Sequence, residues 1–228
     1  MKLLVRPIGL IQLAFIALLI TATPAGADSL NTTLDFSLHL SRQDISLKDG
    51  QQVINTSVKQ LGVTSVDISK HPLQPGLALG YSYISDGDQA VTSGMELEGF
   101  YIAPALRDVL LDGQRVSAAF TAVYLYQRVS DSNAAQTVTM EWLQPQLDLD
   151  IRYLINRQFG LLLGGQYGRV DVDEQVSGGI NQTLHLKHGA EFGYRAGLEI
   201  DLGYDGQVGL LLHRAIGDGV ELYFQRQF

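Results

Sequence analysis

The chain has 228 residues, a formal net charge of -8 and no cysteine. An acidic protein of this kind does not attract the phosphate backbone of nucleic acids, which are therefore excluded as partners. The lack of cysteine excludes disulfides and thiolate metal sites, so stability has to come from backbone pairing and side-chain packing.

Residues 1–27 have the pattern of a secretory signal peptide. Lys2 and Arg6 precede an apolar run from Ile8 to Ile20, which is too short for a typical spanning helix of about 20 residues. Small residues follow, with Ala25 and Ala27 placed for signal-peptidase cleavage. Cleavage after Ala27 removes both of these positive charges and takes the net charge from -8 to -10. A retained N-terminal anchor is the alternative.

Residues 28–228 are expected to form one all-β domain, because no linker divides them and apolar residues recur with a period of two. The clearest segment is 184–202, where apolar residues at even positions alternate with charged residues or glycine. Turn residues such as Asp205-Gly206 and Gly217-Asp218-Gly219 separate the segments. The pattern predicts an antiparallel sheet built from hairpins.

Three features favour a membrane barrel over a soluble sheet. Many segments reach the nine to eleven residues of a tilted spanning strand, whereas soluble strands average about five or six. The chain stops inside a segment whose apolar face holds Val220, Leu222, Phe224 and Phe228. Tyrosines cluster toward segment ends, as in an aromatic girdle: Tyr81, Tyr83, Tyr101, Tyr124, Tyr126, Tyr153, Tyr167 and Tyr204.

The last segment resembles the C-terminal strand of small Gram-negative outer-membrane β-barrels of the OmpA or OmpW kind. The resemblance implies a closed antiparallel transmembrane β-barrel in the outer membrane, with outer-membrane lipids and lipopolysaccharide as its surroundings. It also implies that Leu222, Phe224 and Phe228 belong to the signal read by the barrel-assembly machinery. Arg226 departs from the pattern, since an apolar or aromatic residue is usual there.

Ten strands are predicted, near 31–41, 62–69, 75–85, 93–103, 114–128, 137–155, 160–174, 183–203, 206–214 and 219–228. The alternative is eight strands, with residues 31–69 partly outside the barrel. Residues 42–60 are expected to form an outer loop, and residues 104–113 a longer periplasmic connection that includes a helical turn at 106–111. Apolar positions change from even to odd within 137–155, which predicts a bulge at Gln144-Pro145.

If the apolar face meets lipid, the alternate face points into the lumen. The predicted lumen charges are Asp35, Glu96, Glu98, Asp148, Asp150, Arg152, Lys187, Glu191, Arg195, Glu199, Asp201 and Glu221, with His39 and His213 beside them. In a barrel of eight to ten strands these groups can pair and fill the interior. A narrow, cation-favouring pore is the other interpretation, because carboxylates attract cations.

A catalytic interpretation rests on His39 and Ser41, which share one face of a strand. The pair resembles only loosely the His/Ser element of lipid A deacylases, and no Gly-x-Ser-x-Gly elbow is present. A solvated polar pair is the alternative. No cofactor and no metal site are expected from the sequence.

Three functions remain open at this point. The first is an outer-membrane barrel with a structural role or a narrow small-solute pore. The second is a lipid-modifying hydrolase of the lipid A deacylase kind or a proteolytic barrel enzyme. The third is a surface-binding module that acts through its loops.

Overall fold

The computed structural model describes residues 34–50, 52–69, 73–86, 95–179, 181–214 and 216–228. The predicted signal peptide, with Ala25 and Ala27 at its cleavage site, lies outside these residues. Within the described ranges, no helix is long and apolar enough to cross a membrane.

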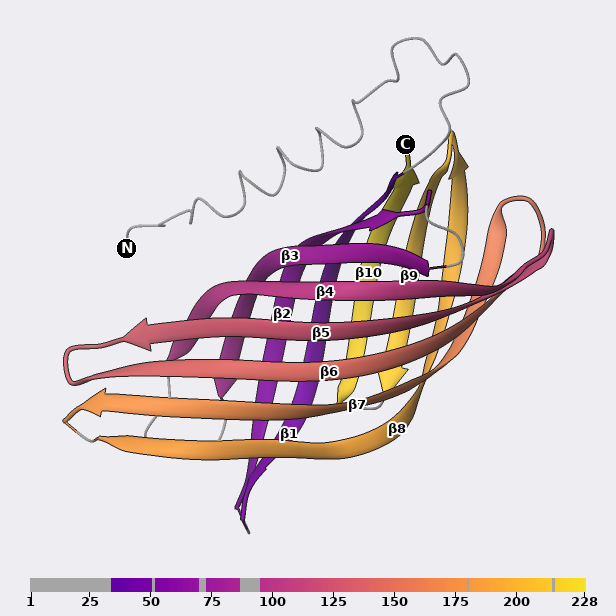
Figure 1. Cartoon of the computed structure of the whole chain (residues 1–228). Coiled ribbons are helices and arrows are strands. Elements are labelled where there is room, and N and C mark those ends of the chain that lie inside the picture. The colour runs from indigo at the N-terminus through magenta and orange to yellow at the C-terminus, as the bar shows by residue number, and fades with distance from the viewer. Residues whose placement is uncertain (1–33, 51, 70–72, 87–94, 180, 215) are drawn as a thin grey trace, which may run out of the picture. The chain divides into compact units, whose positions relative to one another are not determined.

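Ten antiparallel strands form a closed ring in the order β1-β10-β9-β8-β7-β6-β5-β4-β3-β2 (Figure 1). The strands are β1 (Leu34–Asp49), β2 (Gln52–Asp67), β3 (Leu73–Asp86), β4 (Glu96–Asp112), β5 (Val116–Ser132), β6 (Gln136–Leu154), β7 (Phe159–Gly178), β8 (Gln182–Gly203), β9 (Gly206–Arg214) and β10 (Asp218–Gln227). The prediction of an all-β barrel with ten strands is confirmed, and the alternative of eight strands is wrong.

Two predicted connections are strand instead. Residues 42–60, predicted as an outer loop, lie mostly in β1 and β2, which pair continuously from Leu34↔Asp67 to Asp49↔Gln52. Residues 104–113, predicted as a helical turn, mostly continue β4, with a register shift between Val109 and Leu111. The apolar residues at 106–111 therefore extend a strand and form no helix.

The ring contains different numbers of strands at its two ends. We call the end where β1, β3, β5, β7 and β9 finish the outer end, and the end where β10 finishes the inner end. The last pair between β1 and β10 is Asp44↔Asp218, and that between β8 and β9 is Tyr194↔Arg214. Beyond these pairs β1 meets β8 directly, at Lys48↔Lys187. The inner half is thus ten-stranded and the outer half eight-stranded.

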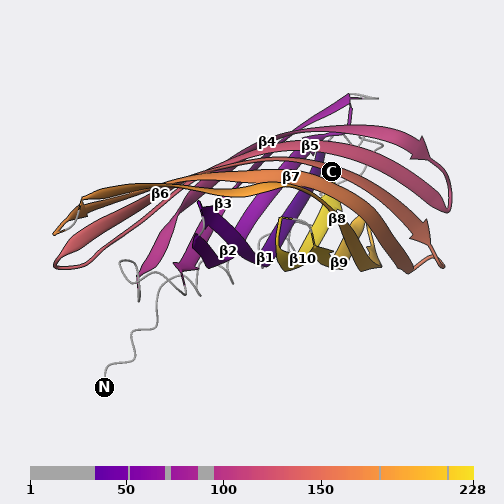
Figure 2. The ribbon, with the colours of Figure 1, turned by 90° about the horizontal axis from the view of Figure 1, so that it is seen from below.

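Buried apolar side chains fill the outer half. We call them the outer core: Ile45, Leu47, Ile54, Val58, Ile84, Met95, Leu97, Val129, Val138, Met140, Trp142, Val170, Val172, Val176, Leu186 and Ile216. They come from every strand from β1 to β8 and from the β9–β10 connection, where Ile216 is fully buried. An eight-stranded barrel is just wide enough for side chains to fill its interior, which explains the dense packing here. Figure 2 shows β4 to β7 arching over β1, β10 and β9.

The polarity of the two faces inverts along each long strand. On β6 the even positions 138–142 carry buried apolar residues, and the even positions 144–152 carry polar or charged residues that also face the interior. The odd positions are polar up to Glu141, whereas Leu147, Leu149 and Ile151 are exposed. Pairing with β5 runs unbroken from Val116↔Tyr153 to Ser132↔Thr137. The predicted bulge at Gln144-Pro145 is wrong: the environment changes and the register does not.

A bulge does occur in β8, where the alternation of 184–202 predicted a single apolar face. Gly168 pairs with Glu191 and Val170 with His188, so Gly189 and Ala190 together lie opposite Arg169. This extra residue exchanges the two faces. Even positions before the bulge point inward, with Leu186 fully buried, whereas Phe192 after the bulge is 86% exposed.

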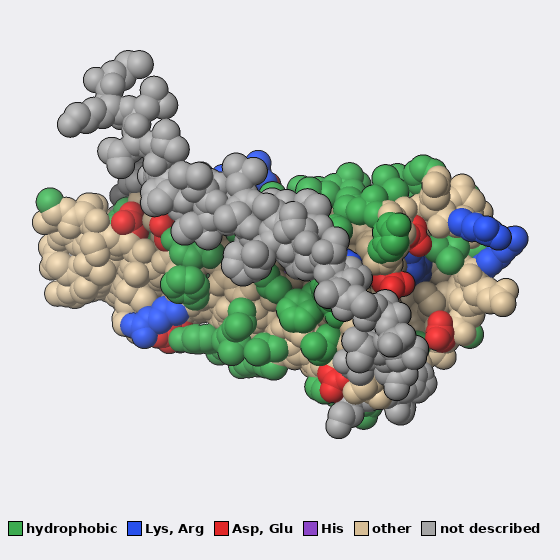
Figure 3. Space-filling view, turned by 90° about the horizontal axis from the view of Figure 1, so that it is seen from above, with side chains coloured by type: hydrophobic (Ala, Val, Ile, Leu, Met, Phe, Trp, Pro, Cys, Tyr) green, Lys and Arg blue, Asp and Glu red, His purple; other side chains and the backbone are tan. Residues whose placement is uncertain are grey.

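The outside of the inner half carries a belt of exposed apolar side chains. On β5 the belt runs from Val116 to Tyr126, a strand length of about 33 Å that a tilt of about 40° reduces to about 25 Å. Exposed cations mark its outer limit, one or two residues beyond the last apolar position: Arg42, Lys59, Arg128, Arg169 and Arg214. In Figure 3, apolar side chains gather toward the middle and right of the visible wall, and its left end is mostly polar.

We expect Leu186→Ala to lower the free energy of unfolding by about 2–5 kcal/mol, because it leaves a cavity in the outer core. The matched control is Thr183→Ala, at an exposed position of the same strand, with an expected effect within about 0.5 kcal/mol. Urea unfolding in detergent, followed by the fluorescence of Trp142, measures both. Equal effects would contradict the burial of this part of β8.

Candidate functional site

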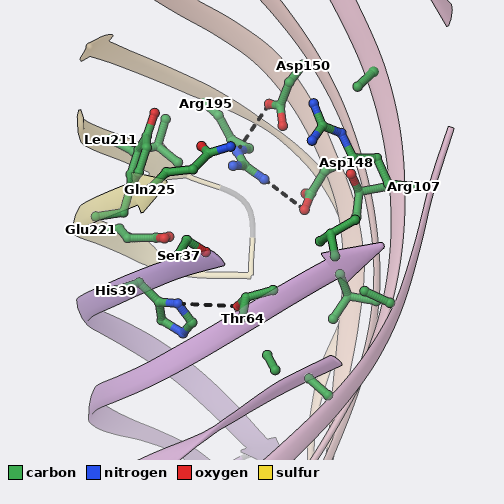
Figure 4. Close-up of a pocket in the computed structure, with 18 of the residues that line it drawn as sticks. Ser37, His39, Thr64, Arg107, Asp148, Asp150, Arg195, Leu211, Glu221 and Gln225 are labelled. Carbon is green, nitrogen blue, oxygen red and sulfur yellow. Dashed lines mark hydrogen bonds and ion pairs between the residues drawn. The ribbon is translucent and has the colours of Figure 1, made fainter. Parts of the chain in front are cut away.

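A polar cavity of about 450 Å³, the inner chamber, occupies the inner half of the ring (Figure 4). It reaches the inner end, because Asp35, Gln74 and Gln227 at strand ends belong to its lining. Leu125 marks its other limit, since this side chain lines the chamber and packs against the outer core. The chamber therefore extends to the strand ends at one end of the barrel and is bounded by apolar packing toward the other.

Opposite charges pair across the chamber wall. Arg195 on β8 lies 2.7 Å from Asp148 and 3.4 Å from Asp150, both on β6 (Figure 4). These strands do not pair directly, so the guanidinium bridges over β7. Burying charges is costly unless they are paired, and the geometry supplies that pairing.

Two further ion pairs lie nearer the inner end. Arg107 on β4 is 3.8 Å from Asp35 on β1, and Arg152 on β6 pairs with Glu199 on β8. Glu199 also accepts a hydrogen bond from the hydroxyl of Tyr223. Arg107–Asp35 connects β4 with β1, and the contacts of Glu199 connect β8 with β6 and with β10. These contacts therefore brace strands that do not pair directly in the ring.

A ladder of side chains connects the outer core with this charge network. Trp142 Nε1 donates to Gln144 (3.2 Å), Gln144 donates to Gln146 (3.0 Å), and Gln146 donates to Asp148 (2.8 Å). All four residues lie on the inward face of β6, two positions apart. The ladder satisfies the indole N–H of the only tryptophan and orients Asp148 toward Arg195.

His39 lies in the chamber wall but is engaged by residues other than Ser41. Its Nε2 is 2.6 Å from the hydroxyl of Tyr101, and its Nδ1 is 3.5 Å from the hydroxyl of Thr64. Both ring nitrogens thus have other hydroxyl partners. Ser41 also lines the chamber, yet the structure brings no nucleophile–base pair together at this position.

Tyr101 corrects one part of the predicted aromatic girdle. Its side chain is 4% exposed and points inward, whereas Tyr124, Tyr167 and Tyr204 are exposed on the outside. The inward ring fits because Gly62 and Gly80 face it: a Cβ on Gly62 would lie 1.7 Å from the Tyr101 hydroxyl oxygen. Glycine here serves close approach of a large side chain, as in other small barrels.

The predicted lumen residues fall into two groups. The chamber lining includes Asp35, His39, Ser41, Asp148, Asp150, Arg152, Arg195, Glu199, His213 and Glu221. The remaining residues lie elsewhere: Glu96, Glu98, Lys187, Glu191 and Asp201.

The second group was misplaced for three structural reasons. Glu96 and Glu98 lie in the outer half, where polar residues face outward, and Glu98 accepts a hydrogen bond from Tyr81. Lys187 and Glu191 lie on either side of the β8 bulge and are exposed. Asp201 accepts a 2.7 Å hydrogen bond from the backbone N–H of Gly203 at the inner turn.

Sequence reasoning missed several lining residues. Arg107 was assigned to a turn, and its place on an inward-facing odd position of β4 follows only from the extension of that strand. Tyr101 and Tyr223 were assigned to the outside or ignored. A run of polar even positions at Gln144 and Gln146, leading into Asp148, was the available signal for the ladder.

The final strand closes the ring through backbone bonds at the inner end. Leu34 N donates to Phe228 O (3.1 Å), and Phe228 N donates to Leu34 O (2.8 Å). Leu222 and Phe228 are exposed and Phe224 is half-buried. Arg226 lies over the Phe228 ring at 5.0 Å, which accommodates its charge beside the apolar positions. The role of this strand in barrel assembly stays a prediction.

In the described part of the chain, no group of three or more His, Asp or Glu side chains is arranged to hold a metal ion. The chamber is lined by paired charges, amides and hydroxyls.

We expect Gly62→Ala to lower the free energy of unfolding by about 1–3 kcal/mol, since the added methyl group displaces the Tyr101 ring. Gly189→Ala is the matched control, because a Cβ there would meet nothing within 4 Å. Urea titration of both variants in detergent measures the difference. A Gly62→Ala variant as stable as Gly189→Ala would contradict the tight fit.

No family model and no curated protein matches the sequence. Solved structures do match in fold. The outer membrane protease OmpT from Escherichia coli has a TM-score of 0.50 at 12% identity, covering 91% of this chain and 100% of that chain. An outer membrane channel from Pseudomonas putida F1 has a TM-score of 0.47 at 12% identity, with the same coverage. The chain thus shares the antiparallel β-barrel fold of the outer membrane protease structure.

Proposed function

We propose that the chain is an integral outer-membrane protein with a closed lumen, and that its role is structural rather than conducting. The outer core carries this proposal. Trp142, Met140 and Leu186 are each at most 1% exposed, and they belong to a cluster that fills the eight-stranded half. A solute that entered the inner chamber would have to displace this packing to leave at the outer end.

The different exteriors of the two halves support the proposed position in the membrane. The apolar belt of the inner half has a height of about 25 Å, which matches the lipid-facing band of membrane barrels. The outer half has a polar exterior and an apolar interior, as in a soluble sheet. On β7, the strand continues from Arg169 to Gly178 for about 30 Å of its length, which is a height of about 23 Å above the belt at the same tilt. The outer half would therefore project from the membrane into water.

The cations at the outer limit of the belt supply a contact with lipopolysaccharide. Arg42, Arg128, Arg169 and Arg214 are exposed, and each lies within 3.2–3.6 Å of an acidic neighbour. These pairs are exposed and individually weak, so a guanidinium can exchange its carboxylate for a lipid phosphate. Contact between these cations and lipid is consistent with a protein that is anchored in the membrane by its apolar belt.

No specific observation favours a role as an enzyme or a role in binding through the loops. The ring nitrogens of His39 contact the hydroxyl groups of Tyr101 and Thr64, so His39 is not placed to act as a base toward Ser41. The connection between β1 and β2 is short, because Asp49 and Gln52 are already paired.

The absence of native cysteine allows a direct test of topology. We expect Gln175→Cys, exposed on outer β7, to react in intact cells with a membrane-impermeant maleimide. Gln158→Cys, in the turn between β6 and β7, should react only after the outer membrane is permeabilised. Leu163→Cys, on the belt, should react only after denaturation. The reverse order for the first two variants would overturn the orientation, and reaction of all three would remove the membrane assignment.

Conductance in planar bilayers tests the closed lumen. The wild-type protein should show no stepwise current, because the outer core excludes water and ions. A Trp142→Gly/Leu186→Gly variant should give small, brief openings, provided that it still shows the heat-dependent gel shift of a folded barrel. Stable current through the wild-type protein would contradict the proposal and favour the narrow pore.

A further inference from the structure

The inner chamber has more negative than positive charge. Five carboxylates line it, from Asp35, Asp148, Asp150, Glu199 and Glu221, against the three guanidinium groups of Arg107, Arg152 and Arg195. Each guanidinium already has a carboxylate partner. The lining therefore has two carboxyl groups more than guanidinium groups, and Arg195 is shared between Asp148 and Asp150. The chamber offers no unpaired cation to an anionic ligand.

Glu221 contributes most directly to this surplus. It lies on the inward face of β10, opposite Ser41 on β1, and its carboxylate points into the chamber (Figure 4). Its neighbours in the lining include Tyr101 and Tyr223, whose rings also face the interior. A carboxylate beside aromatic faces is a favourable surrounding for an ammonium group.

Acceptor oxygens add to the same preference. Gln74 and Gln166 both line the chamber, each 6% exposed, and their Oε1 atoms have no hydrogen-bond partner among the described residues. A buried acceptor without a partner is costly, and a ligand that brings N–H donors would remove that cost. Since no three described acidic or histidine side chains form a metal cluster, the donors favour an organic cation over a metal ion.

We propose that the inner chamber binds a small organic dication, of the diamine class, that enters from the inner end. One ammonium group donates to Glu221 and the other to a glutamine oxygen of the lining, so the ligand offsets the surplus of carboxyl groups. The ligand enters and leaves at the same end, because the outer core closes the other. This binding goes beyond the structural role proposed above, and it does not require the barrel to conduct.

Isothermal titration calorimetry in detergent at low ionic strength tests the proposal, with putrescine as the probe. We expect saturable binding of putrescine and none of 1,4-butanediol or succinate, which have similar lengths but no positive charge. Glu221→Gln should weaken putrescine binding roughly tenfold, since it removes a charged hydrogen-bond acceptor. Asp44→Asn, an exposed carboxylate outside the chamber, should leave binding unchanged.

Several outcomes would overturn this inference. The absence of putrescine binding, or equal binding of the diol, would remove the site. Equal weakening by Glu221→Gln and Asp44→Asn would assign the heat to surface charge. If Glu221→Gln lost the heat-dependent gel shift, Gln166→Leu would take its place, and undiminished binding by that folded variant would contradict the role of the amide oxygen. Because the wild-type ligand series needs no variant, it decides the matter in every case.

Discussion

The structure depends on one constraint, the early end of β9 and β10. These strands have 9 and 10 residues, whereas β7 and β8 have 20 and 22. Where the short hairpin stops, β1 meets β8 and the ring falls from ten strands to eight. Barrel diameter grows with strand number, so the eight-stranded half can be filled by side chains while the ten-stranded half keeps a chamber. Ile216 at the end of the hairpin packs into the space above, and Gly168 makes room for it: a Cβ there would lie 2.5 Å from Ile216 Cδ1.

Sequence periodicity predicted most of the fold, because a strand alternates between apolar and polar residues whether its apolar face points into the barrel or away from it. Periodicity does not indicate which face of a strand points inward. The sequence analysis assumed an apolar exterior for the whole barrel, and this assumption holds only for the inner half. Val138, Met140 and Trp142 break that assumption, and they were misread as a bulge. The true bulge at Gly189-Ala190 lies in a segment of perfect alternation, where nothing in the spacing marks it. Its cause is tertiary: β8 has to leave β1 and turn toward β9.

The candidate site was predictable where charges sit on inward positions of the inner half, as for Asp148, Asp150 and Arg195. The arrangement of these charges was not predictable, since each guanidinium pairs with a carboxylate on a strand that is not its neighbour in the ring. Two glycines illustrate why this arrangement could not be read from the sequence. Gly62 and Gly80 look like weak points in a strand, yet together they provide the space for Tyr101 and hence for its bond to His39. Only the register of three neighbouring strands relates them.

The two halves also differ in how their interiors are stabilised. The outer core gains from burying apolar surface away from water, and the proposed position outside the membrane supplies the aqueous exterior that this gain requires. The inner half has its apolar side chains on the outside, so its interior gains no such burial. Ion pairs between strands and a ladder of side chains along β6 hold its walls together. Trp142 lies where these regimes meet, with its ring in the outer core and its N–H on Gln144. Because the ladder fixes Gln144, Gln146 and Asp148 in turn, a change in the packing of the outer core would reach Arg195 through hydrogen-bonded neighbours. The chamber and the closed end are thus mechanically linked by one strand.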